Sequence, residues 1–174
     1  MSTLLGKCAL AAIVLCGATA RAAQPDDAEI LGIYIQVNSF DIESALLGRA
    51  KTASEPVRML AEHVSSDHLS VRQAAQGLAT SCKVSATLPA ARAQAAMEHD
   101  RKMTELMALK DAAFDDAYLQ YEIAFHRAAI DAVKTLLLPA AKCPALQAHF
   151  RQVLPAFEQH LAHTESLART LAAK

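Results

Sequence analysis

Five residues of this chain could together bind a metal ion: Asp41, His68, Glu122, His126 and His160. Each is polar, yet each falls on or beside the apolar face of a predicted helix when residues are placed about 100° apart around the helix axis. Neutral imidazole and carboxylate groups are ligands for Zn, Fe, Cu and Mn. The residue types therefore indicate a transition-metal ion as the candidate cofactor.

The inward polar residues also fall at similar depths along their helices. Asp41 and His68 lie 13 and 12 residues from the turn that joins their helices, and His126 and His160 lie 13 and 16 residues from theirs. At about 1.5 Å per residue, these positions are about 18–24 Å from the two turns. We therefore predict that the polar side chains meet near the middle of the molecule.

Two interpretations of this cluster are open at the level of sequence. It could bind a metal ion, or it could be a buried hydrogen-bond network in which each histidine pairs with a carboxylate or a tyrosine. A di-iron oxidase centre is not supported, because the Glu-x-x-His motif that such centres use does not occur in the chain. Glu122 and His126 are four positions apart instead, in the pattern Glu-x-x-x-His.

Other candidate ligands are expected to have ordinary roles. His163 falls outside the apolar stripe of its helix and is expected to be solvated. The run Glu98-His99-Asp100 is expected to form a solvated charged face. Met97, Met103 and Met107 have helical spacing and are expected to be packing residues.

Helices must position these residues, because the sequence shows no strand pattern. Abundant Ala and Leu with only 5 Gly favour helix, and Ser54-Glu55-Pro56 is a strong start signal. The expected helices span residues 28–52, 54–82, 90–110, 112–138 and 144–172.

The segment Met1–Ala22 has the features of a secretory signal peptide. It combines Lys7, a short apolar run over residues 8–20 and a small-residue cleavage site, Ala20-Arg21-Ala22. The run is too short to cross a bilayer, which requires about 20 apolar residues. We expect cleavage before Ala23, a periplasmic mature domain of residues 23–174 and no transmembrane span in that domain.

The two cysteines that remain after cleavage predict the helix order. In an oxidising compartment Cys82 and Cys143 most simply form a disulfide, with two buried free thiols as the alternative. In an up-down-up-down bundle they would lie at opposite ends. A helix over residues 90–110 that returns along the outside, about 31 Å long, would place them at the same end. The expected fold is therefore a ferritin-like four-helix bundle with a long helical crossover between the second and third core helices.

Composition limits the classes of partner. The 174 residues include 17 Lys+Arg and 18 Asp+Glu, giving a net charge of −1, and 53% of residues are hydrophobic. Such a chain is expected to form one globular domain. Its charge gives no reason to expect nucleic acid as a partner.

Three segments resemble a known family, domain of unknown function 4142. The first is Val57-Arg-Met-Leu-Ala-Glu-His-Val-Ser-Ser-Asp67-His68, which is similar to the family pattern V-x-x-F-A-x-x-M-V-x-D-H. The second is Phe114-Asp-Asp-Ala-Tyr118, with His126 eight residues later. The third is Leu154-Pro155, with His160 five residues after the proline.

The resemblance covers about residues 28–171 and has small departures. Asp41 stands where the family usually has Glu, and Leu60 and Val64 replace Phe and Met. The resemblance implies an exported protein with a ferritin-like helical bundle, and it implies no particular activity. The sequence therefore favours a periplasmic metal-binding or metal-handling protein, with a non-catalytic structural or stress-related module as the alternative.

Overall fold

The computed structural model describes residues 24–173, and every regular element in that range is helical. The all-helical prediction is thus confirmed there, whereas the proposed signal segment Met1–Ala22 lies outside the described residues. No helix within residues 24–173 is both long and apolar enough to cross a membrane. The elements are α1 (Asp27–Lys51), α2 (Glu55–Cys82), α3 (Arg92–Ala108), α4 (Asp111–Ala132), the π-helical turn η1 (Val133–Leu137), α5 (Leu138–Ala140) and α6 (Pro144–Ala172).

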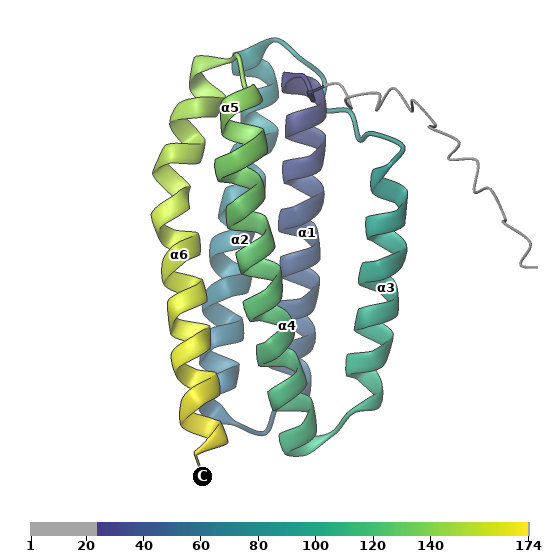
Figure 1. Ribbon diagram of the computed structural model, residues 1–174, viewed down its shortest axis with the longest axis vertical. Coiled ribbons are helices and arrows are strands. Elements are labelled where there is room, and N and C mark those ends of the chain that lie inside the picture. Colours follow the sequence, from purple (N-terminus) through teal and green to yellow (C-terminus); the bar gives the residue numbers. More distant parts are fainter. Residues whose placement is uncertain (1–23, 174) are drawn as a thin grey trace, which may run out of the picture.

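The four long helices α1, α2, α4 and α6 lie side by side, and α3 lies outside them against α1 and α4 (Figure 1). Helix α2 returns antiparallel to α1, and α3 then runs back along the outside before α4 begins. Consequently α2 and α4 run in the same direction. The return by α3 is what brings the end of α2 and the start of α6 to one end of the molecule.

Local signals in the sequence explain where the helices begin. Asp26 caps α1, because its side chain accepts a hydrogen bond from the Glu29 backbone N–H while the Glu29 carboxylate accepts one from the Asp26 N–H. Pro56 and Pro144 occupy the first turns of α2 and α6, where the missing N–H costs no helical hydrogen bond.

The core consists of two apolar clusters with a polar layer between them. One cluster includes Ile30, Tyr34 and Phe150, and the other includes Val64 and Phe114. Along each long helix the residues of one cluster precede the polar layer and those of the other follow it. The polar residues of the layer are Asn38, Asp41, Ser44, Ser65, His68, Glu122, His126, His160 and Thr164.

The predicted Cys82–Cys143 disulfide is confirmed. The two Cα atoms are 5.6 Å apart, which is the usual separation in a disulfide. The bond joins the last residue of α2 to the residue that precedes α6.

Two glycines allow close contacts with α1. A Cβ on Gly32 would overlap the backbone carbonyl of Thr87, whose N–H donates to the Ala28 carbonyl and holds the loop after α2 on α1. A Cβ on Gly48 would lie 2.5 Å from the ring of Tyr118 on α4. The absence of a side chain at these positions lets the loop and α4 approach the α1 backbone.

Candidate metal centre

The polar layer contains all five residues that the sequence singles out, and each long helix contributes at least one. Asp41 comes from α1, His68 from α2, Glu122 and His126 from α4, and His160 from α6. None of the five is more than 4% exposed.

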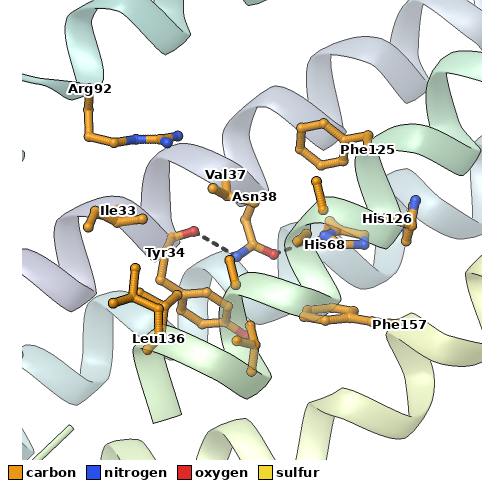
Figure 2. A pocket seen from close by; sticks show the side chains of 15 residues that line it. Ile33, Tyr34, Val37, Asn38, His68, Arg92, Phe125, His126, Leu136 and Phe157 are labelled. Carbon is orange, nitrogen blue, oxygen red and sulfur yellow. Dashed lines mark hydrogen bonds between the residues drawn. The ribbon is translucent and has the colours of Figure 1, made fainter. Parts of the chain in front are cut away.

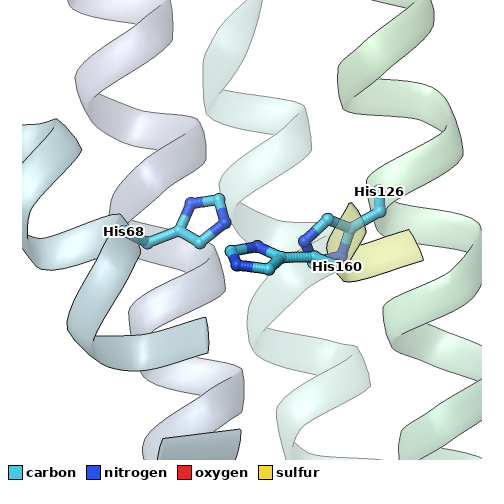
Figure 3. A group of neighbouring side chains, drawn as sticks. All are labelled: His68, His126 and His160. Atoms are coloured by element: carbon cyan, nitrogen blue, oxygen red, sulfur yellow. The ribbon is translucent and has the colours of Figure 1, made fainter. Parts of the chain in front are cut away.

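Contacts between these side chains link the four helices. Asp41 Oδ2 lies 3.0 Å from His68 Nε2 and 3.5 Å from His126 Nε2. The ring of His160 lies near both histidines, with centroids 5.4 Å from His68 and 5.5 Å from His126. Figure 3 shows the three imidazole rings facing a common space between their helices.

Each histidine uses one ring nitrogen to donate a hydrogen bond away from this space. His68 Nδ1–H donates to Asn38 Oδ1 at 2.9 Å, and the Asn38 amide is fixed because its Nδ2 donates to the Tyr34 carbonyl. His126 Nδ1–H donates to the backbone carbonyl of Glu122 at 3.0 Å. For His160, Nε2–H donates to Asp67 Oδ2 at 3.0 Å.

These outer hydrogen bonds determine which nitrogen of each neutral ring carries a lone pair. The lone pairs are on His68 Nε2, His126 Nε2 and His160 Nδ1. All three atoms are buried and make no hydrogen bond of acceptable geometry with a described residue, although His68 Nε2 is 3.0 Å from Asp41 Oδ2. The three histidines offer ligand atoms within 4.8 Å of one another, and a metal ion held by such lone pairs would satisfy them.

The electrostatics keep two of the histidines neutral. Burial lowers the pKa of His126, although the charge of Asp41 acts in the opposite direction. Burial, together with the charges of His68 and His126, lowers the pKa of His160 to about 4. Neutral imidazole is the form that binds metals, so these rings need lose no proton at neutral pH.

The two carboxyl groups of the cluster differ in charge. Burial acts to raise the pKa of Asp41, but the positive charge that His68 and His126 carry when protonated outweighs it, so that this pKa lies below its usual range. Burial and the charge of Asp41 raise the pKa of Glu122 well above its usual value. Asp41 is therefore the carboxyl group of the cluster that ionises more readily, whereas the raised pKa of Glu122 favours its protonated form, and Glu122 Oε1 accepts a hydrogen bond from the Ser44 hydroxyl at 2.7 Å.

The family comparison can now be set beside this geometry. A family model described as domain of unknown function (DUF4142) matches residues 15–167. The chain belongs to the DUF4142 family. The resemblance seen in the sequence is thus confirmed, and the DUF4142 match includes every residue of the polar layer. The family description assigns no activity, and no curated protein and no solved structure matches the chain.

The prediction that the run Glu98-His99-Asp100 is a solvated face is wrong for His99. His99 is 6% exposed, and its ring stacks on Phe40, with ring centroids 4.2 Å apart. It also hydrogen-bonds to the Tyr121 hydroxyl and to the Glu43 carboxylate, each at 3.1 Å. The charged run indicated a solvated face, because the sequence could not show α3 packing on α1 and α4.

The remaining expectations are met in part. His163 is exposed, as predicted. Met103 is buried, but Met97 and Met107 are 65% and 54% exposed, so the packing role is wrong for these two.

Asn38 and Asp67, which orient two of the cluster histidines, were not predicted as site residues. Asn38 lies three residues before Asp41 on the same helical face, and Asp67 directly precedes His68. The signal for Asn38 is its place on the inward face. Asp67 could not be assigned from the sequence, because its partner His160 is on another helix.

Proposed function

We propose that this protein is an exported metal-binding or metal-handling protein that holds one transition-metal ion in a ferritin-like four-helix bundle. In this proposal α1, α2, α4 and α6 are the core helices and α3 is the crossover helix. The ligands are His68, His126, His160 and Asp41. The observation that carries the proposal is the convergence of three buried imidazole lone pairs, each oriented by an outer hydrogen bond, beside the Asp41 carboxylate.

Two of the distances fit a compact four-coordinate site. Ligand atoms about 2.0–2.1 Å from a tetrahedral Zn²⁺ ion are about 3.3–3.4 Å apart. The separations of Asp41 Oδ2 from His68 Nε2 and His126 Nε2, 3.0 and 3.5 Å, lie on either side of this value. Three nitrogens and one oxygen suit Zn²⁺ and also Cu, Fe or Ni.

Metal analysis of protein purified without a histidine tag tests the proposal. We expect about one transition-metal ion per chain, or one after reconstitution with Zn²⁺. If the protein stays metal-free under reconstitution, the alternative holds, in which the histidines only form a packing network within a structural or stress-related module.

Glu122 is the member of the predicted ligand set that this proposal leaves outside the coordination shell, although Asp41, Glu122 and His126 also form a group that could hold a metal ion. Glu122→Gln is uncharged and keeps an acceptor for the Ser44 hydroxyl, so we expect the metal content to stay at the wild-type value. Asp41→Asn removes the anionic ligand and is expected to weaken binding by more than about tenfold. Metal content after dialysis measures both, and metal loss in Glu122→Gln would make Glu122 a ligand.

Glu122→Gln also has a predicted effect on the stability of the metal-free protein. Because the pKa of Glu122 is raised in the folded state, its contribution to stability is present below the unfolded pKa and is lost as the pH rises through the folded pKa. Glu122→Gln lacks this loss and is expected to be more stable than the wild type at pH 7. Urea unfolding at pH 7 and at acid pH checks this. The difference in stability between the two proteins is expected to disappear at acid pH.

Export is the second part of the proposal. It is supported by the composition of Met1–Ala22 and by the Cys82–Cys143 disulfide, a bond that persists in oxidising compartments such as the periplasm. The exported protein is expected to begin at Ala23. The intact mass of periplasmic protein measures this, and a mass that includes residues 1–22 would contradict it.

A further inference from the structure

A cavity of about 280 Å³ lies between α1, α4 and η1, next to the polar layer. Its walls are mostly apolar and include Ile33, Val37, Phe125, Val133 and Leu136. Figure 2 shows Arg92 at the end near Ile33, and His126 and Phe157 at the opposite end.

Small side chains and a π-helical turn create this space. Ala128, Ala129 and Ala132 are the small α4 residues that line it, and η1 begins directly after Ala132. Such single π-helical turns within α-helices are frequent at functional sites. Leu136, which lines the cavity, is 41% exposed, so the cavity reaches the protein surface.

Arg92 is the one cation that lines the cavity. Its Nε–H donates to Gln36 Oε1 at 2.8 Å, which holds the side chain over α1. No carboxylate within residues 24–173 lies within ion-pair distance of Arg92, and neither Nη group hydrogen-bonds to a described residue. Partial burial lowers the pKa of Arg92, but a guanidinium stays charged in proteins.

We propose that this cavity binds an amphipathic carboxylate, with the carboxylate on the Arg92 guanidinium and the apolar chain extending past Val37 and Leu136 toward Phe157. The unpaired cation at one end and the apolar walls match the two parts of such a molecule. Arg is suited to this role because its planar fork can bind a carboxylate through two hydrogen bonds. The volume is near the lower limit of small-molecule sites, about 300 Å³, which favours a medium-length single chain.

Calorimetric titration of the full chain with decanoate, decanol and decylamine tests this proposal. The protein is first stripped of metal with a chelator, so that the outcome does not depend on the metal proposal. We expect saturable binding of decanoate with one site per chain, and binding of decylamine that is weaker by about tenfold or more. Absence of saturable decanoate binding below its aggregation concentration would overturn the proposal, as would equal binding of the amine.

Two variants locate the site. Arg92→Gln is expected to weaken decanoate binding about tenfold and to leave decanol binding unchanged. The matched control is Arg101→Gln, because Arg101 is exposed on the same helix and pairs with Glu105. Equal decanoate affinity in Arg92→Gln and the control would overturn the proposal.

Ala132→Phe fills the cavity and is expected to abolish binding of both decanoate and decanol. Circular dichroism confirms that the variant is folded. If it does not fold, Ala129→Leu replaces it as a smaller obstruction. Unchanged decanoate binding in a folded cavity-filling variant would place the ligand elsewhere and overturn the proposal.

Discussion

Alanine in place of His68 or His126 is expected to abolish metal binding while the helices stay folded. In the proposed site each substitution removes one of the four ligands and leaves the other three without a closed coordination shell. Removal of a partner outside the ligand shell already costs about 10–100-fold in metal affinity, so loss of a ligand is expected to cost more. Metal content after dialysis, with circular dichroism as the measure of folding, checks this result.

His163→Ala is the matched control, because His163 is exposed on α6 three residues from His160. It is expected to keep the wild-type metal content. Asn38→Ala is expected to have an intermediate effect, about 10–100-fold, because Asn38 orients the His68 ring without being a ligand.

A different pattern would favour the packing network. In that case the substitutions at His68 and His126 would each lower the free energy of unfolding by about 1–3 kcal/mol through orphaned buried partners. The wild-type protein would then have no metal to lose. Metal loss with intact folding and destabilisation of a metal-free protein are thus separate results of one experiment.

Loss of the Cys82–Cys143 disulfide is expected to lower the free energy of unfolding by about 4 kcal/mol. The two cysteines are 61 residues apart, and a crosslink over this separation restricts the unfolded chain more than the folded one. The double variant Cys82→Ala/Cys143→Ala is expected to show this effect in urea unfolding. Reduced wild-type protein should unfold at nearly the same urea concentration as the double variant.

The metal content of the double variant is expected to be unchanged under conditions where it is folded. Cys82 is 14 residues from His68 along α2, or about 21 Å, so the disulfide does not touch the polar layer. Equal unfolding midpoints for oxidised wild-type protein and the double variant would contradict the predicted stabilisation.

Much of the helical framework follows from local sequence. Proline at the first turns of α2 and α6 and the Asp26–Glu29 capping box determine where helices begin, because they act on backbone groups a few residues away. Apolar residues at helical spacing determine which face of each helix is buried. For this reason the inward positions of Asp41, His68 and His126 could be predicted from periodicity and depth alone.

The two cysteines allowed a prediction about residues far apart in the sequence. Their pairing required the end of α2 and the start of α6 to meet, and this requirement placed the segment before α4 on the outside. The disulfide prediction is confirmed, and a covalent bond of fixed length restricts topology more strongly than any pattern of apolar residues.

Only the tertiary structure decided how the cluster histidines are oriented and what lies beside them. Ring orientation depends on Asn38 and Asp67, and Asp67 binds a histidine 93 residues away on another helix. The buried position of His99 likewise depends on α3 covering Phe40. These contacts join different helices, and packing of the whole core sets how those helices are rotated relative to one another. That rotation cannot be predicted from the sequence of a single helix. The sequence therefore determined which residues face inward, and packing determined which of their atoms meet.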